Sequence, residues 1–175
     1  YGAHLLKCAF WLARVGRRDF AEELATDLVE RCFDGERFVI RAGTKRTYLH
    51  SHCYALEGLI GLGLYPEVVA AGAGWLASQQ AADGSLADWY GAPSRCRPAD
   101  VCAQALRIWA LCDAARFAPH MAAAREHLAS LQAAEGGLRY HQGSDDINSW
   151  ASVFALQGLV WSQQRPSDQE LQCLL

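Results

Sequence analysis

Apolar residues recur along most of this chain with the three-to-four-residue spacing of an amphipathic helix. The pattern predicts helices over seven segments: 3–15, 18–32, 48–64, 66–80, 99–116, 119–133 and 148–163. The last five residues, 171–175, also have a helical pattern. β-Branched residues are sparse and alanine and leucine are plentiful, which favours helix, and no segment has a convincing strand pattern. We therefore expect an all-α fold.

The predicted helices repeat with a period of about 50 residues. Tyr54–Leu59 aligns with Gln104–Trp109 and Phe154–Leu159, so that an Ala-Leu pair recurs at positions 55, 105 and 155. Between these helices, residues 75–86 align with residues 127–138, and a degenerate copy precedes them. The chain therefore contains about three and a half copies of one helical hairpin, which predicts a stack of hairpins.

The two helices of each repeat differ in polarity. Helices 48–64, 99–116 and 148–163 are apolar almost all round, as expected of helices packed on several sides, whereas the other helices carry charged residues on one face. We expect the first set to form an inner layer and the second set an outer layer. Pro66 suits a first helical turn, and Gly84 is expected to take a positive φ and end the preceding outer helix.

The three long loops, 34–50, 83–99 and 135–148, each run from the end of an outer helix to the start of an inner helix, so they must lie on one face of the stack. Loops on a rigid scaffold often carry function, and free N–H groups at helix starts favour anionic ligands. The polar and aromatic residues expected on this face are Arg41, Lys45, Arg46, Tyr48, His50, His52, Asp88, Trp89, Tyr90, Arg95, Arg97, Asp100, Arg139, Tyr140, His141, Asp145, Asp146, Asn148 and Trp150.

Composition and charge narrow the class of protein. The 175 residues are 51% hydrophobic, with 16 basic and 19 acidic side chains and a net charge of -3, so the chain lacks the basic stripe of a nucleic-acid-binding protein. No apolar run reaches the ~20 residues of a membrane span, and no signal segment opens the chain. The seven cysteines form no C-x-x-C pair and fit reduced thiols. We expect a cytoplasmic protein with no nucleic-acid partner and no membrane span.

Two turns carry a family resemblance. Gln80-x-x-Asp83-Gly84 and Gln132-x-x-Glu135-Gly136 resemble the Gln-x-x-Asp-Gly-x-Trp repeat of terpenoid cyclases and protein prenyltransferases, which belong to the α/α-toroid superfamily, although the tryptophan is absent here. Residues 50–59 and 148–157 also resemble toroid proteins encoded with bacterial polysaccharide genes. The resemblance implies repeated helical hairpins of about 50 residues that form a partial or complete α/α toroid.

A closed toroid of that superfamily needs more helices than the seven predicted here. The resemblance therefore implies that residues 1–175 form a single α/α-toroid-like domain that is part of a longer chain, or an arc completed by a second copy. The inner helices at the ends of such an arc would expose apolar surface, through which the protein could associate with itself.

The starts of the inner helices offer candidate metal ligands. In equivalent positions they hold His50 and His52, Asp100 and Cys102, and Trp150 and Ser152. Histidine, cysteine and aspartate all bind zinc, and Asp100-Val101-Cys102 resembles the Asp-x-Cys of prenyltransferases, so His52, Asp100 and Cys102 are the candidate zinc ligands. The alternative is that Asp100 caps its helix and Cys102 packs in the core. Apart from zinc, no cofactor is expected.

Two neighbouring acids, Asp145 and Asp146, precede the third inner helix. They resemble part of the Asp-rich motif with which class II terpene cyclases protonate an alkene. Paired carboxylates can raise one another's pKa and so produce a general acid. The alternative is that Asp146 or Asn148 caps the helix that follows.

The loop face also carries the residue types that act on glycans. The toroid resemblance implies that a polysaccharide lyase would use a Tyr or His base with Asn, His or Arg against the uronate carboxylate, and a glycosidase needs two carboxylates, for which Asp88, Asp100, Asp145 and Asp146 are available. The candidate catalytic residues are His50, His52, Tyr140, His141, Asp145, Asp146 and Asn148. The candidate substrate-binding residues are Asp88, Trp89, Tyr90, Arg95, Arg97, Arg139 and Trp150.

Three hypotheses for function follow. The preferred one is a glycan-processing or glycan-binding toroid, with lyase or hydrolase activity on an anionic polysaccharide at the loop face. The second is an enzyme of the terpenoid cyclase or prenyltransferase type, which would need an apolar central cavity. The third is a non-catalytic helical-repeat protein that binds a sugar or another protein.

Overall fold

The computed structural model describes residues 2–171, and all seven predicted helices are present with ends shifted by a few residues. The helices are α1 (Leu5–Arg14), α2 (Arg18–Cys32), α3 (Leu49–Leu62), α4 (Pro66–Gln79), α5 (Ala99–Asp113), α6 (Ala118–Ser130) and α7 (Ser149–Gln163), followed by the short α8 (Asp168–Leu171). Of the helical pattern expected at the end of the chain, residues 172–175 lie outside the described residues.

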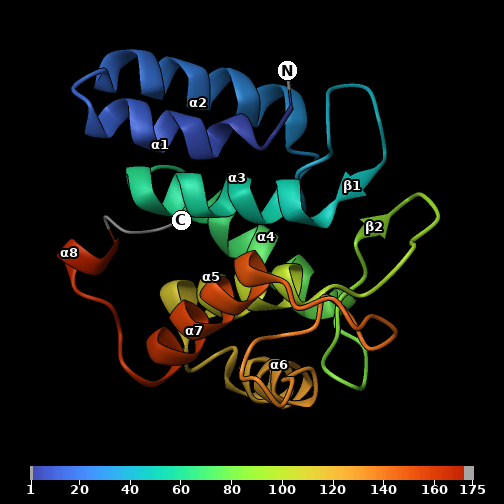
Figure 1. Ribbon diagram of the computed structural model, residues 1–175. Helices are drawn as coiled ribbons and strands as arrows, with labels where there is room; N and C mark the ends of the chain where they lie inside the picture. Colours follow the sequence, from blue (N-terminus) through green and yellow to red (C-terminus); the bar gives the residue numbers. More distant parts are fainter. Residues whose placement is uncertain (1, 172–175) are drawn as a thin grey trace.

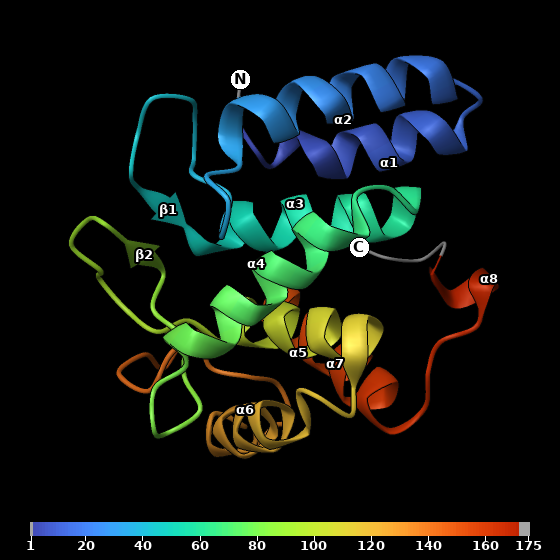
Figure 2. The same cartoon turned by 180° about the vertical axis from the view of Figure 1, so that it is seen from behind.

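The helices form two layers, as the polarity of each repeat predicts. Helices α1, α3, α5 and α7 pack side by side in sequence order to make the inner layer. The outer helix α2 packs on α1, α4 packs on α3 and α5, and α6 packs on α5 and α7 (Figures 1 and 2). The all-α fold of repeated hairpins is therefore confirmed.

Glycine allows the inner helices to approach one another closely. A Cβ atom at Gly58 of α3 would lie 2.2 Å from the carbonyl oxygen of Leu6 in α1. At Gly158 of α7, the equivalent position 100 residues later, a Cβ atom would lie 3.2 Å from the carbonyl oxygen of Ala103 in α5. The glycines of the apolar helices therefore mark close helix packing, which a larger side chain would disrupt.

Gly84 takes the positive φ expected, but it does not end the outer helix, because α4 already ends at Gln79 with Gln80 extended and Gly84 lies in the turn that follows. Gly84 has a φ of +81°, and a Cβ atom there would lie 2.1 Å from the carbonyl oxygen of Ala123. The side chain of Gln80 donates from Nε2 to the carbonyl oxygens of Gly84 (3.1 Å) and His120 (3.0 Å). The glutamine and glycine of the repeated motif thus close this turn and join it to the next outer helix.

The expectation of no strand is wrong at one place. Two-residue strands β1 (Thr47–Tyr48) and β2 (Trp89–Tyr90) pair antiparallel, with Thr47 opposite Tyr90 and Tyr48 opposite Trp89. A strand of two residues is too short to show an alternating pattern in the sequence. This pairing joins the first long loop to the second.

The three long loops do lie on one face of the arc (Figure 1). The backbone N–H of Leu49, at the start of α3, donates to the carbonyl oxygen of Asp88 in the second loop. In the same way the N–H of Ala99, at the start of α5, donates to the carbonyl oxygen of Tyr140 in the third loop. Each of these inner helices is therefore tied at its start to the loop that follows in the sequence.

Four equivalent residues of the inner helices form a polar row, which we call the charged row and which is buried except at its half-buried last member. Its members are Lys7, Glu57, Arg107 and Gln157, spaced 50 residues apart. The Nζ atom of Lys7 lies 2.9 Å from Glu57 Oε2, and Arg107 donates to both Glu57 and Gln157. This row is not predicted from the sequence, although three of its members occupy the same position in the aligned Ala-Leu helices.

Apolar side chains are exposed at both ends of the inner layer, as expected for an arc. On α7 they are Trp150, Val153, Leu156 and Val160, and on α1 Trp11. Leu156 has 66% of its surface exposed. Self-association through these ends stays a prediction.

The described residues also bear on the expectations for cysteines and membranes. The six cysteines between residues 2 and 171 are free thiols, and Cys173 lies outside this range. In the same range, no helix is both long enough and apolar enough to cross a membrane.

Candidate functional site

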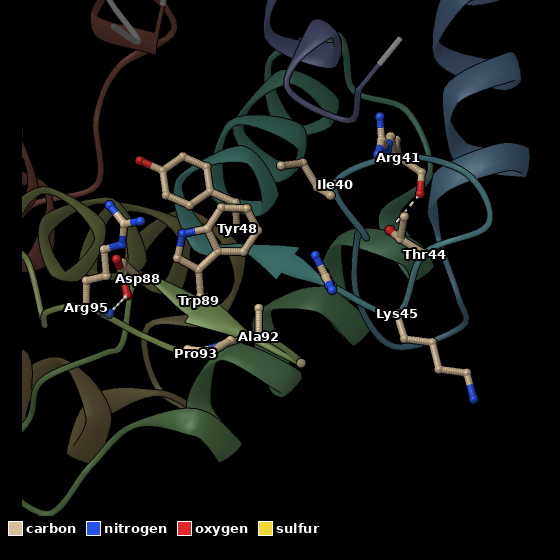
Figure 3. Close-up of a pocket in the computed structure, with 12 residues that line it drawn as sticks. Ile40, Arg41, Thr44, Lys45, Tyr48, Asp88, Trp89, Ala92, Pro93 and Arg95 are labelled. Atoms are coloured by element: carbon tan, nitrogen blue, oxygen red, sulfur yellow. Dashed lines mark hydrogen bonds between the residues drawn. The ribbon is translucent and has the colours of Figure 1, made fainter.

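A cleft of about 1020 Å³ lies between the first and second long loops, and we call it the loop cleft (Figure 3). It is lined by Ile40, Arg41, Thr44, Lys45, Arg46, Tyr48, Asp88, Trp89, Gly91, Ala92, Pro93 and Arg95. The paired strands place Tyr48 and Trp89 next to each other, with ring centroids 4.9 Å apart and ring planes 34° apart. The cleft therefore has an aromatic wall between two polar loops.

The lining of the loop cleft has a positive charge. Four basic residues line it, Arg41, Lys45 and Arg46 from the first loop and Arg95 from the second, against one acid, Asp88, and the Lys45 side chain extends away from the aromatic wall (Figure 3). The carboxylate of Asp88 is already engaged, because its Oδ1 accepts from Ser94 Oγ (2.7 Å) and from the backbone N–H of Arg95 (3.1 Å). The four basic groups are exposed and available to an anionic ligand.

A histidine and an aspartate from neighbouring inner helices meet beside the aromatic wall. His50 Nδ1 lies 3.4 Å from Asp100 Oδ2, and the other carboxylate oxygen accepts from the backbone N–H of Val101 (2.8 Å). The His50 ring lies 6.0 Å from the Tyr48 ring and 4.2 Å from the Tyr54 ring. The two side chains are therefore in contact, although His50 Nδ1 makes no hydrogen bond among residues 2–171 and neither residue lines the loop cleft itself.

Tyrosines near this pair are held in the protonated form. Burial is the main cause that raises the pKa of Tyr48, and the negative charges of Asp100 and Asp88 raise it further. Burial also raises the pKa of Tyr140, followed by the charge of Asp100. Both phenols therefore keep their proton at neutral pH and can donate a hydrogen bond.

The structure does not bring the three candidate zinc ligands together. His52 Nδ1 accepts from the backbone N–H of Phe38 (3.0 Å), and Cys102 Sγ lies 3.6 Å from the carbonyl oxygen of Gly84. Asp100 faces His50 instead. Within residues 2–171 no three His, Cys, Asp or Glu side chains meet in a group that could hold a metal ion.

The side chains at positions 52, 102 and 152 instead contact the backbone of the turns that precede the inner helices. As His52 does for Phe38, Ser152 Oγ accepts from the backbone N–H of Leu138 (2.9 Å). His52 is fully buried, and burial lowers its pKa to about 3. His52 does not line the loop cleft and bonds with the backbone, so it has a structural place rather than the catalytic one expected.

Tyr90 also serves the fold rather than the cleft. Its hydroxyl accepts from the backbone N–H of Ala87 (3.1 Å) and lies 3.4 Å from the carbonyl oxygen of Gln79. Its ring packs edge-on against Trp75. Tyr90 is not among the residues that line the loop cleft.

The third loop contributes little to the loop cleft. Asn148 caps α7, because its Oδ1 accepts from the backbone N–H of Ala151 (2.8 Å), as the capping alternative predicts. Asp145, Asp146 and Arg139 are exposed, and none of them lines the cleft. The side-chain carboxylates of the two acids are therefore in solvent and outside the cleft.

The remaining predicted site residues lie around the cleft. Trp150 is half-exposed, with its ring against Phe154, whose ring also lies 6.4 Å from that of His50. Arg97 and His141 line a separate, smaller pocket. Of the residues predicted for binding, the structure therefore brings Asp88, Trp89 and Arg95 into one cleft.

Comparison with known proteins defines the class of fold. No protein-family model and no curated protein sequence matches this chain at a significant level. Among solved structures, a family 88 glycosyl hydrolase from Bacteroides vulgatus is similar with a TM-score of 0.68 and 11% identity, over 100% of this chain and 63% of that one. A polysaccharide lyase is similar with a TM-score of 0.67 and 13% identity, over 99% of this chain and 62% of that one.

These similarities confirm the fold of an α/α toroid built from helical hairpins. At identities this low they show the fold alone. The chain spans less than two thirds of the length of both similar structures.

Proposed function

We propose that this chain binds an anionic polysaccharide in the loop cleft and processes it beside the His50–Asp100 pair. The observation that carries the proposal is the Tyr48–Trp89 wall with basic side chains from both loops around it. Flat aromatic rings offer apolar surface to the faces of sugar rings, and guanidinium groups pair with carboxylates. The names of the two similar structures, a glycosyl hydrolase and a polysaccharide lyase, also support a glycan as the substrate.

The chemistry that fits these residues best is β-elimination from a uronate. His50 Nε2 would take the proton from C5, while a basic side chain of the cleft neutralises the uronate carboxylate. The C4–O4 bond then breaks, a C4=C5 double bond forms, and Tyr48 or Tyr140 gives a proton to the departing O4. Asp100 would orient the imidazole and stabilise its protonated form, as carboxylates do for catalytic histidines.

Hydrolysis is the second candidate, because Asp100 is a buried carboxylate at the same place. A glycosidase also needs a second carboxylate across the scissile bond. The nearest acid of the cleft, Asp88, is engaged by hydrogen bonds from its own loop. For this reason we favour elimination over hydrolysis.

The isoprenoid hypothesis receives less support from the described residues. A cavity for a polyprenyl chain should be apolar, whereas the inner helices here face one another with Lys7, Glu57 and Arg107. The three candidate zinc ligands also have separate partners. We therefore propose neither cyclase nor prenyltransferase activity.

Calorimetric titration tests the proposed binding. Wild-type protein should bind a trigalacturonate and not a neutral maltotriose of the same length. Trp89→Ala and Arg46→Gln should each weaken binding about tenfold or more, which is a loss of ~1.4 kcal/mol or greater. Trp11→Ala and Arg165→Gln, which change an exposed tryptophan and an arginine outside the cleft, serve as matched controls. Equal binding of the neutral sugar, or full affinity in Trp89→Ala, would contradict the proposal.

A further inference from the structure

A second polar pocket of about 270 Å³ opens next to the loop cleft, and we call it the His127 pocket. It is lined by Asp83, Arg95, Cys96, Arg97, His127, His141, Gln142 and Gly143. These residues come from the turn after α4, the loop before α5, the last turn of α6 and the third long loop. The pocket therefore gathers polar groups from parts of the chain that are far apart in sequence.

The imidazole of His127 is the unexplained group in this pocket. The residue is 4% exposed, and its Nε2 has no hydrogen-bond partner among residues 2–171. Burial lowers its pKa, and the charge of Arg97 lowers it further against the opposing charge of Asp83. A buried polar atom without a partner costs free energy, so a ligand that bonds with Nε2 would recover that cost.

The charges of the pocket favour an anion. Arg95 and Arg97 supply two positive charges, while the one acid, Asp83, uses its Oδ1 to accept from the backbone N–H and the hydroxyl of Ser85. Arg97 Nη1 donates to the same hydroxyl (3.1 Å), which holds the guanidinium at the pocket. A neutral imidazole with its proton on Nε2 would add a third donor.

A metal ion does not fit the same residues. The described side chains of His127, His141, Cys96 and Asp83 do not converge into a group that could hold one. Burial also raises the pKa of the Cys96 thiol, and the charge of Asp88 adds to this effect, so the thiolate that a metal requires is disfavoured. The chemistry of the pocket is therefore that of an oxyanion site.

Arg95 lines both this pocket and the loop cleft, so the two hollows adjoin. We propose that the His127 pocket binds a second anionic group of the same glycan, on a sugar residue beyond the one held in the loop cleft. The proposal rests on the proposed function and narrows its substrate class to glycans that carry anionic groups on more than one residue. The small volume suits one charged substituent rather than a whole oligosaccharide.

The test compares galacturonate with trigalacturonate by calorimetric titration. In the wild-type protein the trisaccharide should bind at least about tenfold more tightly, because its second carboxylate binds within the same molecule. Arg97→Gln and His127→Gln should each remove most of this gain and leave the affinity for the monosaccharide unchanged. Arg125→Gln, on α6 but outside both hollows, should keep the gain.

Two further measurements keep the test decisive. Circular dichroism melting curves identify a variant that has lost its fold, and Arg97 is exposed, so that variant should melt as the wild type does. In the wild type, trigalacturonate should shift the NMR signals of the His127 ring, and galacturonate should not.

The failures of the two proposals can be told apart. If Arg97→Gln keeps the gain, or weakens both sugars equally, or if trigalacturonate leaves the His127 signals unmoved, the second site is contradicted while the loop cleft stands. If the wild type binds neither sugar, the proposed function fails and this inference fails with it.

Discussion

Glu57 and Arg107 occupy the same position in successive repeats, and their oppositely charged side chains form an ion pair that is fully buried between α3 and α5. Lys7 extends the contact to α1 and Gln157 extends it to α7. One polar row therefore crosses all four inner helices at a constant step of 50 residues. The polar side chains of such a row meet their partners only when the repeats pack in one register. The row is therefore suited to fixing how neighbouring repeats stack in the arc.

Removal of one partner from this row should be costly. Arg107→Met leaves the buried Glu57 carboxylate with one fewer cationic partner and should lower the free energy of unfolding by about 3–5 kcal/mol. Urea denaturation measures the change. Arg18→Met, which breaks the exposed Arg18–Glu22 pair, should cost less than about 1 kcal/mol. Similar small losses in both variants would contradict a structural role for the charged row.

Two glycines should respond to alanine in opposite ways. Gly58→Ala forces a methyl group against the backbone of α1 and should destabilise the fold by about 1–3 kcal/mol or more. At Gly74, in α4, the nearest atom to a new Cβ is the flexible Nη2 of Arg116 at 3.3 Å. Gly74→Ala should therefore be neutral or stabilise by up to about 1 kcal/mol. Thermal melting compares the two, and equal stability of both variants would refute the close approach of α1 and α3.

Acid should destabilise the fold through His52. Its pKa falls from an ordinary value of 6.5 to about 3 in the folded state, so the folded protein binds fewer protons than the unfolded chain between these limits. Above about pH 6.5 the His52 imidazole is neutral in both states and does not lower the free energy of unfolding. As the pH falls from 6.5 toward 3, the free energy of unfolding decreases by up to about 1.4 kcal/mol per pH unit.

Urea denaturation at pH 7 and at pH 4.5 checks this dependence. His52→Asn keeps a polar group but removes the titration, so it should be less stable at pH 7 and lose less stability on acidification. His4→Asn, at an exposed histidine, serves as the control. An equal loss in the wild type and His52→Asn would show that other groups carry the acid sensitivity.

The paired acids of the third loop should be dispensable. Asp145 and Asp146 are exposed and do not line the loop cleft. The double variant Asp145→Asn/Asp146→Asn should therefore keep the affinity for trigalacturonate within about twofold, which corresponds to less than ~0.5 kcal/mol. A tenfold loss of affinity would show that these acids belong to the binding site.

Much of the fold could be predicted because the spacing of apolar residues and the Gln-x-x-Asp-Gly turn both recur along the sequence. The 50-residue step also placed His50 and Asp100 in register, and the structure shows that they meet. The zinc hypothesis used the same register at His52 and Cys102, but these two side chains contact the turns that precede their helices, whereas His50 contacts Asp100. Helical periodicity says which residues share a face, not which partner that face meets.

The aromatic wall shows the other limit of the sequence. Tyr48 was expected on the loop face and Trp89 was expected to bind substrate, but their contact depends on a strand pairing of two residues. Local pattern cannot reveal so short a pairing between distant loops. The His127 pocket was missed for a related reason, because His127 lies in an outer helix whose sequence indicates only packing.

The most direct test of the account is the product formed from oligouronates at neutral pH. Wild-type protein should generate the C4=C5 double bond, seen as ultraviolet absorbance, and His50→Gln and Asp100→Asn should each slow this reaction by about 100-fold or more. Asp19→Asn, which changes an exposed acid in the first turn of α2, should keep full activity. New reducing ends without the double bond, no turnover of any oligouronate by the wild type, or full activity in His50→Gln would contradict the proposed elimination at this site.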